Sequence, residues 1–383
     1  MQNFTYHNPT KIVFGQGTLD RIGPESAPYG KKALYIYGKG SIKTNGIYAK
    51  TVVSLKSVGI ELVEFGGVKA NPVLSHTREG VALAKRGNVD MIVAVGGGSV
   101  IDEAKAIAAG AVMDADIWEF YARRYKPTGA LPLLTVLTMS ATGTEMNGGT
   151  VITNEETKEK LGMVDPWLFP KASILDPTTL VTVPADQTAY GAVDAVTHLL
   201  ESYFTQEDTY TPIQDRYVEG IVRTITEITA TMLKNPGELT ARSTFMWAAT
   251  LAWNGLAPSG VGNWTLPNHL IGHSMSALHD TAHGASLSIS LSGWMPWYAD
   301  QGGGAARLAQ LGKAVFDVTG AAETIEAFRT WFRSIGSPTT LADIGVDDAG
   351  LVKIAENIAH CAPLWGLPEY SAPFCEAVLR RCR

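Results

Sequence analysis

Residues 89–112 read VDMIVAVGGGSVIDEAKAIAAGAV, and this one segment indicates the class of fold. Its apolar start predicts a buried β-strand, residues 96–99 (GGGS) predict a tight turn, and the alanine-rich remainder predicts a helix. A strand that passes through a glycine turn into a helix is typical of βαβ units and a mostly parallel sheet. The segment therefore predicts an α/β fold.

The alternation of strands and helices extends through the first half of the chain. Further strands are expected at residues 31–38, 59–65, 131–138 and 172–177. Beyond residues 183–186 (VPAD), helical periodicity takes over and strand patterns almost disappear. We therefore expect an α/β domain over residues 1–184 and an all-helical domain over residues 185–383, with a ligand site in the cleft between them.

Composition excludes several classes of protein. The chain has 383 residues, of which 45% are hydrophobic and 18% charged, as expected for a soluble globular protein. Its net charge of −6 without a long basic run argues against a nucleic-acid partner. Neither a membrane span nor a signal peptide is expected, because the apolar runs are too short. Three cysteines are too few for a disulfide scaffold, which favours a reducing, cytoplasmic setting.

The glycine turn at residues 96–99 suits a phosphate group. Glycines let the backbone approach a ligand closely, and the following helix offers free N–H groups and the positive end of its dipole. The turn therefore predicts a pyrophosphate cradle, although it lacks the G-x-G-x-x-G spacing of the dinucleotide fingerprint. The alternative is a plain tight turn with Ser99 as the helix cap.

Two other turns carry polar residues after expected strands. The turn after residues 31–38 holds Lys39, Ser41 and Lys43 but no carboxylate of the kind that binds the adenosine ribose of NAD. This composition suits a 2′-phosphate and favours NADP, unless the lysines are ordinary surface residues. The segment 138–145 (TMSATGTE) is rich in hydroxyls that suit a diphosphate or ribose, although such residues are also common in plain turns.

Histidines and one aspartate occur at helical spacing in the second half. Asp194 and His198 are four residues apart, as are His269 and His273, and His283 follows ten residues later. One carboxylate with several imidazoles predicts a site for a divalent transition metal of the Fe²⁺ or Zn²⁺ type. Spacing alone does not decide which histidines bind, and a single pair also fits a histidine packed between helices.

With these motifs in place, the chain resembles the iron-containing (group III) alcohol dehydrogenases, most closely their NADPH-dependent butanol dehydrogenase and aldehyde reductase branch. The segments that carry the resemblance are PTKIVFGQG (9–17), NPVLSHTREGVALAK (71–85), VAVGGGSVIDEAKAIA (93–108), LTMSATGTEMNGGTVI (137–152), LDPTTLVTVPADQTAYGAVDAVTHLLESY (175–203) and HLIGHSMSALHDTAHG (269–284). The resemblance implies an N-terminal Rossmann-like α/β domain and an all-α C-terminal domain, the architecture shared with dehydroquinate synthase. It also implies a homodimer.

The resemblance further implies roles for individual residues. It implies metal ligation by Asp194, His198, His269 and His283, and it places His273 beside the nicotinamide and the substrate. Positions that match cofactor contacts of the family are Gly38, Lys39, Gly40, Ser41, Gly97, Gly98, Ser99, Asp102, Thr138, Thr142 and Lys160. Lys39 replaces a glycine that is common in the NADPH branch.

The expected activity is hydride transfer between NADPH and a small aldehyde, or the reverse from a primary alcohol. A metal ion acts as Lewis acid, and His273 is the candidate proton donor. Candidates to line the pocket are Trp247, Trp253, Trp264, Trp294 and Trp297. Two alternatives remain open, namely a metal- and NAD-dependent cyclising lyase of the same fold and a metallohydrolase with Glu201 as the nearby acid.

Overall fold

The computed structural model describes residues 1–208 and 210–382. The chain divides into two compact units. The α/β unit consists of His7–Val183 and Gly237–Thr250, and the helical unit consists of Met1–Tyr6, Pro184–Pro236 and Leu251–Arg383. The boundary expected near residue 184 coincides with one transition between the units. Residues 1–6 precede this boundary but belong to the helical unit, and residues 237–250 follow it but belong to the α/β unit.

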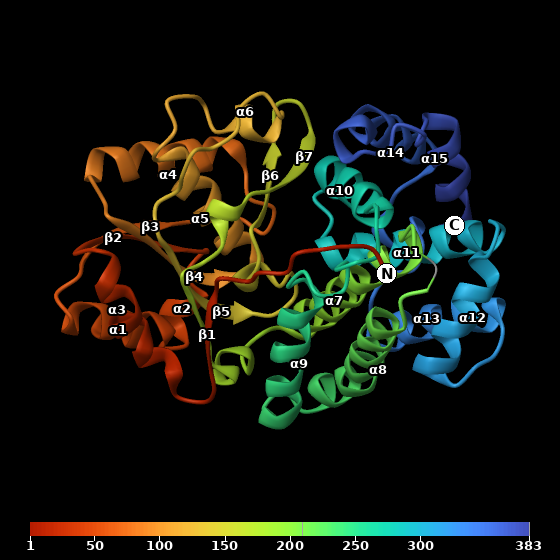
Figure 1. The fold of residues 1–383 in the computed structure, drawn as a ribbon, viewed down its shortest axis with the longest axis horizontal. Helices are drawn as coiled ribbons and strands as arrows, with labels where there is room; N and C mark the ends of the chain where they lie inside the picture. Colours follow the sequence, from red (N-terminus) through yellow and green to blue (C-terminus); the bar gives the residue numbers. More distant parts are fainter. Residues whose placement is uncertain (209, 383) are drawn as a thin grey trace. The chain divides into compact units, whose positions relative to one another are not determined.

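The α/β unit is built on a six-stranded parallel sheet in the order β1-β8-β5-β4-β2-β3 (Figure 1). The strands are β1 (Lys11–Phe14), β2 (Lys32–Tyr37), β3 (Glu61–Gly66), β4 (Met91–Gly97), β5 (Leu133–Met139) and β8 (Ala172–Leu175). The central strand β4 is buried along almost its whole length because helices cover both faces of the sheet. The predicted α/β class is confirmed. The edge strand β1 was not predicted from the sequence.

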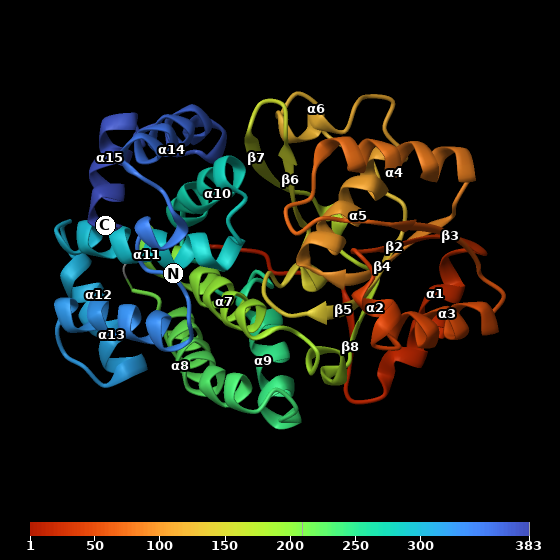
Figure 2. The same ribbon diagram turned by 180° about the vertical axis from the view of Figure 1, so that it is seen from behind.

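Helices cover the two faces of this sheet in pairs. The helices α1 (Ile22–Ser26) and α3 (Ile47–Ser57) pack on one face and supply Ile22, Ile47 and Leu55 to its core. The helices α4 (Leu74–Gly87) and α5 (Gly98–Gly110) pack together on the opposite face, as the view from behind also shows (Figure 2).

The order of the strands reverses between β2 and β4. From β2 the chain continues through α2 (Ser41–Thr44) and α3 to the edge strand β3, whereas from β4 it continues through α5 to β5 on the other side. In open α/β sheets, ligands bind at the carboxyl ends of the strands where the order reverses. The turns after β2 and β4 both lie at this point.

A small antiparallel hairpin completes the α/β unit. Its strands are β6 (Gly149–Asn154) and β7 (Glu159–Val164). The sequence analysis did not predict it, because the segment 149–164 is polar and lacks a strong alternation of apolar residues.

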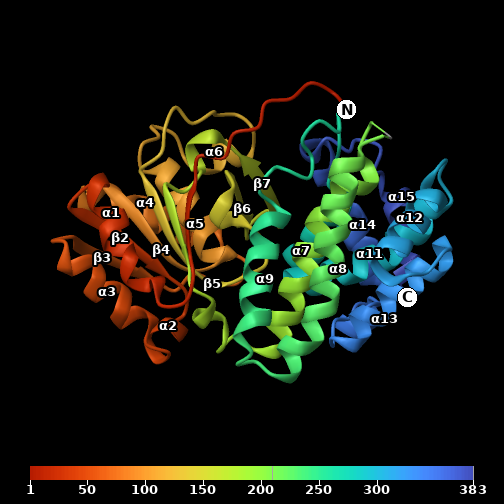
Figure 3. The same cartoon turned by 60° about the horizontal axis from the view of Figure 1, so that its bottom comes forward.

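The helical unit is organised around α7 (Ala185–Thr205). This helix is buried from Thr188 to Phe204 except at Tyr190, and it contacts α8, α10 and α11. Figure 3 shows α7 and α8 running alongside one another. The other helices of this unit are α8 (Pro212–Lys234), α10 (Pro267–His279), α11 (His283–Ala299), α12 (Gly304–Phe316), α13 (Ala321–Ser334), α14 (Asp348–Cys361) and α15 (Ala372–Leu379). The helix α9 (Leu239–Ala252) belongs mainly to the α/β unit. No helix in the described part of the chain is both long and apolar enough to cross a membrane.

Candidate functional site

Asp194 and three of the histidines noted in the sequence lie together in one cluster in the helical unit. Asp194 and His198 lie one turn apart on α7, and His198 Nδ1 is 3.5 Å from Asp194 Oδ1. The helix α10 places His269 Nε2 3.7 Å from the same oxygen, and the first residue of α11 places His283 Nε2 3.5 Å from it. Ligand atoms of Asp194, His198 and His269 all lie within 4.8 Å of one another. One carboxylate oxygen is therefore surrounded by three imidazoles from three helices.

Three polar atoms of this cluster are buried without a hydrogen-bond partner among the described residues. They are Asp194 Oδ1, His198 Nδ1 and His269 Nε2. Burying an unpaired polar atom costs about 1–3 kcal/mol, so such groups are rare unless a ligand completes them. A carboxylate oxygen and imidazole nitrogens are the donor set of a divalent transition metal. The cluster fits a metal of that kind.

Glu201 orients His269 from behind. Its Oε1 accepts hydrogen bonds from the backbone N–H of His269 at 2.8 Å and from Nδ1 of the ring at 2.9 Å. Its Oε2 lies 3.3 Å from Nδ2 of Asn268. Because Nδ1 is the donor to Glu201, Nε2 is left to face Asp194, as in carboxylate–histidine–metal arrangements. Glu201 is thus committed to His269, which argues against its role as the base of a metallohydrolase.

The electrostatics of the cluster favour positive charge beside Asp194. Burial opposes protonation of His269, but the negative charge of Asp194 and the hydrogen bond with Glu201 outweigh it and raise its pKa to about 9. At His198 burial prevails and lowers the pKa to about 4. A cation is therefore stabilised at one point between these side chains, which is where a metal would supply it.

A glycine that the sequence analysis did not single out brings α11 to α7. A Cβ atom at Gly284 would overlap the backbone carbonyl of Tyr190 on α7. Only glycine permits this approach, and the neighbouring His283 reaches Asp194 because of it.

His273 lies beside the cluster, one turn after His269 on α10. Its ring is buried, with its centroid 5.1 Å from that of His283 and 4.8 Å from that of Trp365 in a T-shaped contact. Trp365, in the short 3-10 helix Ala362–Trp365, was missed because nothing in its local sequence marks it. His279 ends α10 near Gly350 and is not part of the metal cluster found among the described residues.

Only some of the expected tryptophans lie near the cluster. Trp253 packs on His198 with ring centroids 4.6 Å apart, and Trp264 contacts Trp253 at 5.6 Å. Trp294 stacks on Tyr298. Trp297 contacts Phe374 within the helical unit. Trp247 contacts Phe14, and both residues belong to the α/β unit. The apolar wall beside the metal cluster is therefore Trp253, with Trp264 behind it.

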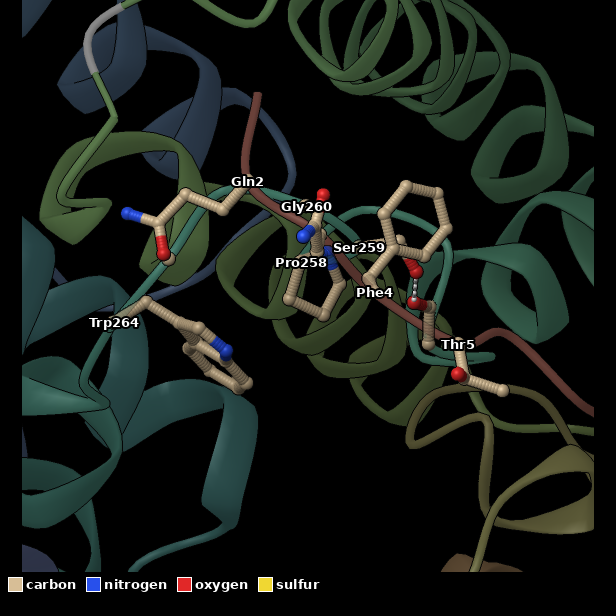
Figure 4. A pocket seen from close by; sticks show the side chains of 10 residues that line it. Gln2, Phe4, Thr5, Pro258, Ser259, Gly260 and Trp264 are labelled. Carbon is tan, nitrogen blue, oxygen red and sulfur yellow. Dashed lines mark hydrogen bonds between the residues drawn. The ribbon is translucent and has the colours of Figure 1, made fainter.

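A separate cavity lies beside the N-terminal segment of the helical unit. Figure 4 shows Gln2, Phe4 and Thr5 along the N-terminal segment, with Pro258, Ser259 and Gly260 beside them and Trp264 near Gln2. None of its lining residues carries an ionisable side chain. The cavity therefore offers no acid, base or metal ligand for catalysis.

In the α/β unit, the glycine turn after β4 is closely packed. The helix α5 begins at Gly98 with Gly97 as its N-cap, and a Cβ atom at Gly98 would lie 2.5 Å from Thr142 Oγ1. The turn and Thr142 are thus in contact, and the thirteen-residue helix presents its free N–H groups there. Ser99 donates its hydroxyl hydrogen to the carbonyl of Ala70, so the interpretation of Ser99 as helix cap was wrong.

Asp102 lies one turn into α5 and is fully engaged inside the α/β unit. Its carboxylate accepts hydrogen bonds from Thr144 Oγ1 at 2.6 Å and from the backbone N–H of Val151 at 3.0 Å. Burial raises the pKa of Asp102 to about 6 and lowers that of the neighbouring Lys105 to about 7. These contacts tie α5 to the hairpin strand β6, while a contact of Asp102 with a cofactor stays a prediction.

The remaining predicted cofactor residues lie near the carboxyl ends of the strands or on the hairpin. Thr138 is at the end of β5, and Lys160 on β7 donates to Asn71 Oδ1 at 2.9 Å. In the turn after β2, Gly40 has a φ of +122°, which favours glycine, and Lys39 and Ser41 are exposed. Of the other predicted cofactor residues, Gly38 follows β2, and Gly97 and Gly98 lie where β4 meets α5. Both turns flank the point where the strand order reverses.

Comparisons with known proteins agree with this arrangement. Residues 9–177 match the family model described as iron-containing alcohol dehydrogenase, and residues 188–369 match the C-terminal domain of the Fe-containing alcohol dehydrogenase family. The chain is 43% identical to a probable NADH-dependent butanol dehydrogenase 1 of Bacillus subtilis over 366 residues, 93% of each chain. It is 35% identical to the NADPH-dependent aldehyde reductase YqhD of Escherichia coli over 368 residues, 94% of this chain and 93% of that one.

A solved structure shows the same fold. The crystal structure of NADH-dependent butanol dehydrogenase A from Thermotoga maritima aligns with a TM-score of 0.96 and 42% identity, covering 100% of this chain and 99% of that one. Both domains, the cluster of metal-binding residue types and these relatives agree, so the chain belongs to the iron-containing alcohol dehydrogenase family, in the branch of butanol dehydrogenases and aldehyde reductases.

Proposed function

We propose that this enzyme interconverts small aldehydes and primary alcohols by metal-assisted hydride transfer, with NADPH as the preferred cofactor. Its family supports oxidoreduction of alcohols and aldehydes. The observation that carries the metal requirement is the set of three buried, unpartnered ligand atoms on Asp194, His198 and His269.

The residues of the helical unit have distinct roles in this proposal. Asp194, His198, His269 and His283 would hold Fe²⁺ or Zn²⁺, which when bound supplies Lewis-acid stabilisation of the charge developing on the substrate oxygen. Glu201 keeps Nε2 of His269 aimed at the cluster.

His273 is the proposed proton donor. In its protonated form the imidazole gives a proton to the substrate oxygen during aldehyde reduction, and in its neutral form it takes the proton back during alcohol oxidation. Trp365 supports the ring of His273 through their T-shaped contact. Trp253 packs on His198 and excludes water beside it. The bound nicotinamide supplies the hydride.

The residues of the α/β unit bind the dinucleotide in this proposal. The turn at residues 96–99 and Thr142 form the pyrophosphate cradle, since the glycines bring the turn into contact with Thr142 and the helix α5 presents its free N–H groups there. Lys39 and Ser41 favour the 2′-phosphate of NADPH because both are exposed and the turn after β2 contains no carboxylate. Named relatives include both NADH- and NADPH-dependent enzymes, so the preference is to be measured.

We further propose a homodimer in the cytoplasm. In the described chain β1 pairs only with β8, so its outer edge is open, and the exposed Phe14 and Trp247 contact each other there. An open edge with exposed aromatic residues supports pairing with a second copy. The three free, buried cysteines support a reducing compartment.

The test is oxidation of NADPH and NADH with a short aliphatic aldehyde. Enzyme loaded anaerobically with Fe²⁺ or Zn²⁺ is compared with chelator-treated enzyme. We expect turnover that disappears with the metal and is faster with NADPH. Turnover that is unaffected by metal removal would refute the role of the cluster, and a metal-replete protein without turnover would favour the lyase or hydrolase alternatives.

A further inference from the structure

A compact polar cluster lies next to the turn after β2. We call it the Glu64 cluster, and it consists of Tyr37 at the end of β2, Lys43 on α2, Tyr48 on α3 and Glu64 on β3. Glu64 accepts a hydrogen bond from Tyr37 OH at 3.1 Å and another from Tyr48 OH. Lys43 Nζ lies 3.6 Å from Glu64 Oε2. The ion pair of Lys43 with Glu64 thus connects α2, which follows the turn, with the neighbouring strand β3.

Lys43 is held by more than its carboxylate partner. Its Nζ lies 4.7 Å from the ring centroid of Tyr37 and 4.9 Å from that of Tyr48, within the range of cation–π attraction. Hydrogen bonding with Tyr37 raises the pKa of Lys43, and hydrogen bonding from Tyr48 lowers the pKa of Glu64. Both groups are therefore charged at neutral pH, and the lysine is directed toward β3.

Lys39, four residues earlier, has a different environment. It is exposed, and no carboxylate of a described residue forms an ion pair with it. The two lysines that flank Gly40 and Ser41 are therefore not equivalent, although the sequence presents them as a similar pair. Lys39 is available to an anion, whereas Lys43 is neutralised.

We propose that Glu64 limits the preference for NADPH over NADH by holding Lys43 away from the 2′-phosphate. This inference rests on the proposed placement of the adenosine ribose at the turn after β2. Lys39 and Ser41 alone then provide the attraction for the phosphate, so both cofactors are accepted.

The test measures binding directly, independently of turnover. NADPH and NADH are titrated into metal-loaded enzyme, with nicotinamide fluorescence as the readout. Glu64→Gln keeps the acceptor for the tyrosine hydroxyls and removes the charge. We expect it to tighten NADPH binding about three- to tenfold, the size of a partly exposed charge interaction, with a change below about twofold for NADH.

A double-mutant cycle identifies Lys43 as the source of the gain. Lys43→Ala alone is expected to change NADPH binding by less than about twofold, because the lysine is already neutralised. In the Glu64→Gln background the same substitution should remove most of the gain. Lys39→Ala should weaken NADPH binding in both backgrounds.

Glu61→Gln is the matched control, since Glu61 lies on the same strand and pairs with Lys32 instead. An equal gain in this variant would mean that only net charge matters and would overturn the inference. So would an unchanged NADPH affinity in Glu64→Gln, or a tenfold loss in Lys43→Ala alone. If no variant binds either nucleotide, the proposed function fails and this inference with it, whereas binding with an unchanged ratio overturns only the inference.

Discussion

Each unit of the molecule buries a charged cluster, and the two clusters differ in how fully they are satisfied. In the α/β unit, Lys105 Nζ is buried and donates toward oxygens of Thr144, Asn147 and Gly149 at 2.6–3.2 Å. In the helical unit, Asp194 Oδ1 is equally buried but has no hydrogen-bond donor among the described residues. One cluster is complete within the fold, whereas the other fits a cation as the missing partner of its buried atoms.

The difference separates a structural network from a binding site. A buried charge with all its hydrogen bonds made contributes to holding elements together, and removing it leaves its partners unsatisfied. A buried group without partners lowers stability until its ligand arrives. We therefore expect substitutions in the Lys105 network to affect folding, and substitutions around Asp194 to affect metal binding and activity.

The largest effect is expected for Asp194→Ala. Loss of the central carboxylate should abolish metal binding and lower turnover at least about a thousandfold, because Lewis-acid stabilisation is lost. Bound metal is measured by elemental analysis together with turnover. His360→Ala, which removes an exposed histidine of α14, should leave both unchanged. A metal-replete, fully active Asp194→Ala would exclude this carboxylate as a ligand.

Lys105→Met should destabilise the protein by about 3 kcal/mol, because it leaves several buried carbonyl groups without their donor and removes the positive charge near Asp102. Urea unfolding of the metal-free protein measures this change, so that metal binding does not contribute. The control is Lys313→Met, which breaks an exposed pair with Asp317 and should cost less than about 1 kcal/mol. Equal stability of the two variants would contradict a structural role for the Lys105 network.

His273→Ala should slow turnover about a hundredfold through loss of the proton donor while metal content stays unchanged. Single-turnover rates with a metal assay separate the two effects. Trp365→Ala should give a smaller decrease of the same kind, because the ring of His273 loses its T-shaped support. Loss of metal in His273→Ala would instead place this histidine among the ligands.

The smallest effect concerns the pair formed by His76 and the buried Glu103, whose Nδ1 and Oε1 are 2.6 Å apart. This hydrogen bond raises the pKa of His76 above its ordinary 6.5. The stabilisation by protonated His76 is therefore complete below pH 6.5 and is lost as pH rises through the raised pKa. His76→Phe should lower stability by about 1 kcal/mol at pH 6 and less at pH 9. The ring of His76 also stacks on Phe65, with ring centroids 4.4 Å apart. A cost that is independent of pH would show that this packing, and not the charge of His76, accounts for the effect.

Much of the fold followed from local patterns. The strands β2, β3, β4, β5 and β8 lie within one or two residues of the apolar runs that predicted them, because buried parallel strands have a strong sequence pattern. The hairpin of β6 and β7 was missed because its residues are polar. The grouping of residues 237–250 with the α/β unit was also not visible, since a helical pattern does not show what the helix packs against.

The sequence by itself determined that Asp194 and His198 share a helical face, and that a glycine turn joins a buried strand to a helix. Both follow from the periodicity of the backbone, which needs no distant contact. Only the tertiary structure decided that His269 and His283 approach the same oxygen of Asp194, that Glu201 orients His269, and that Gly284 permits the approach. It also distinguished Lys39 from Lys43, because the partners of Lys43 come from β2, α3 and β3. Contacts between elements depend on packing across the fold, and local spacing does not encode them.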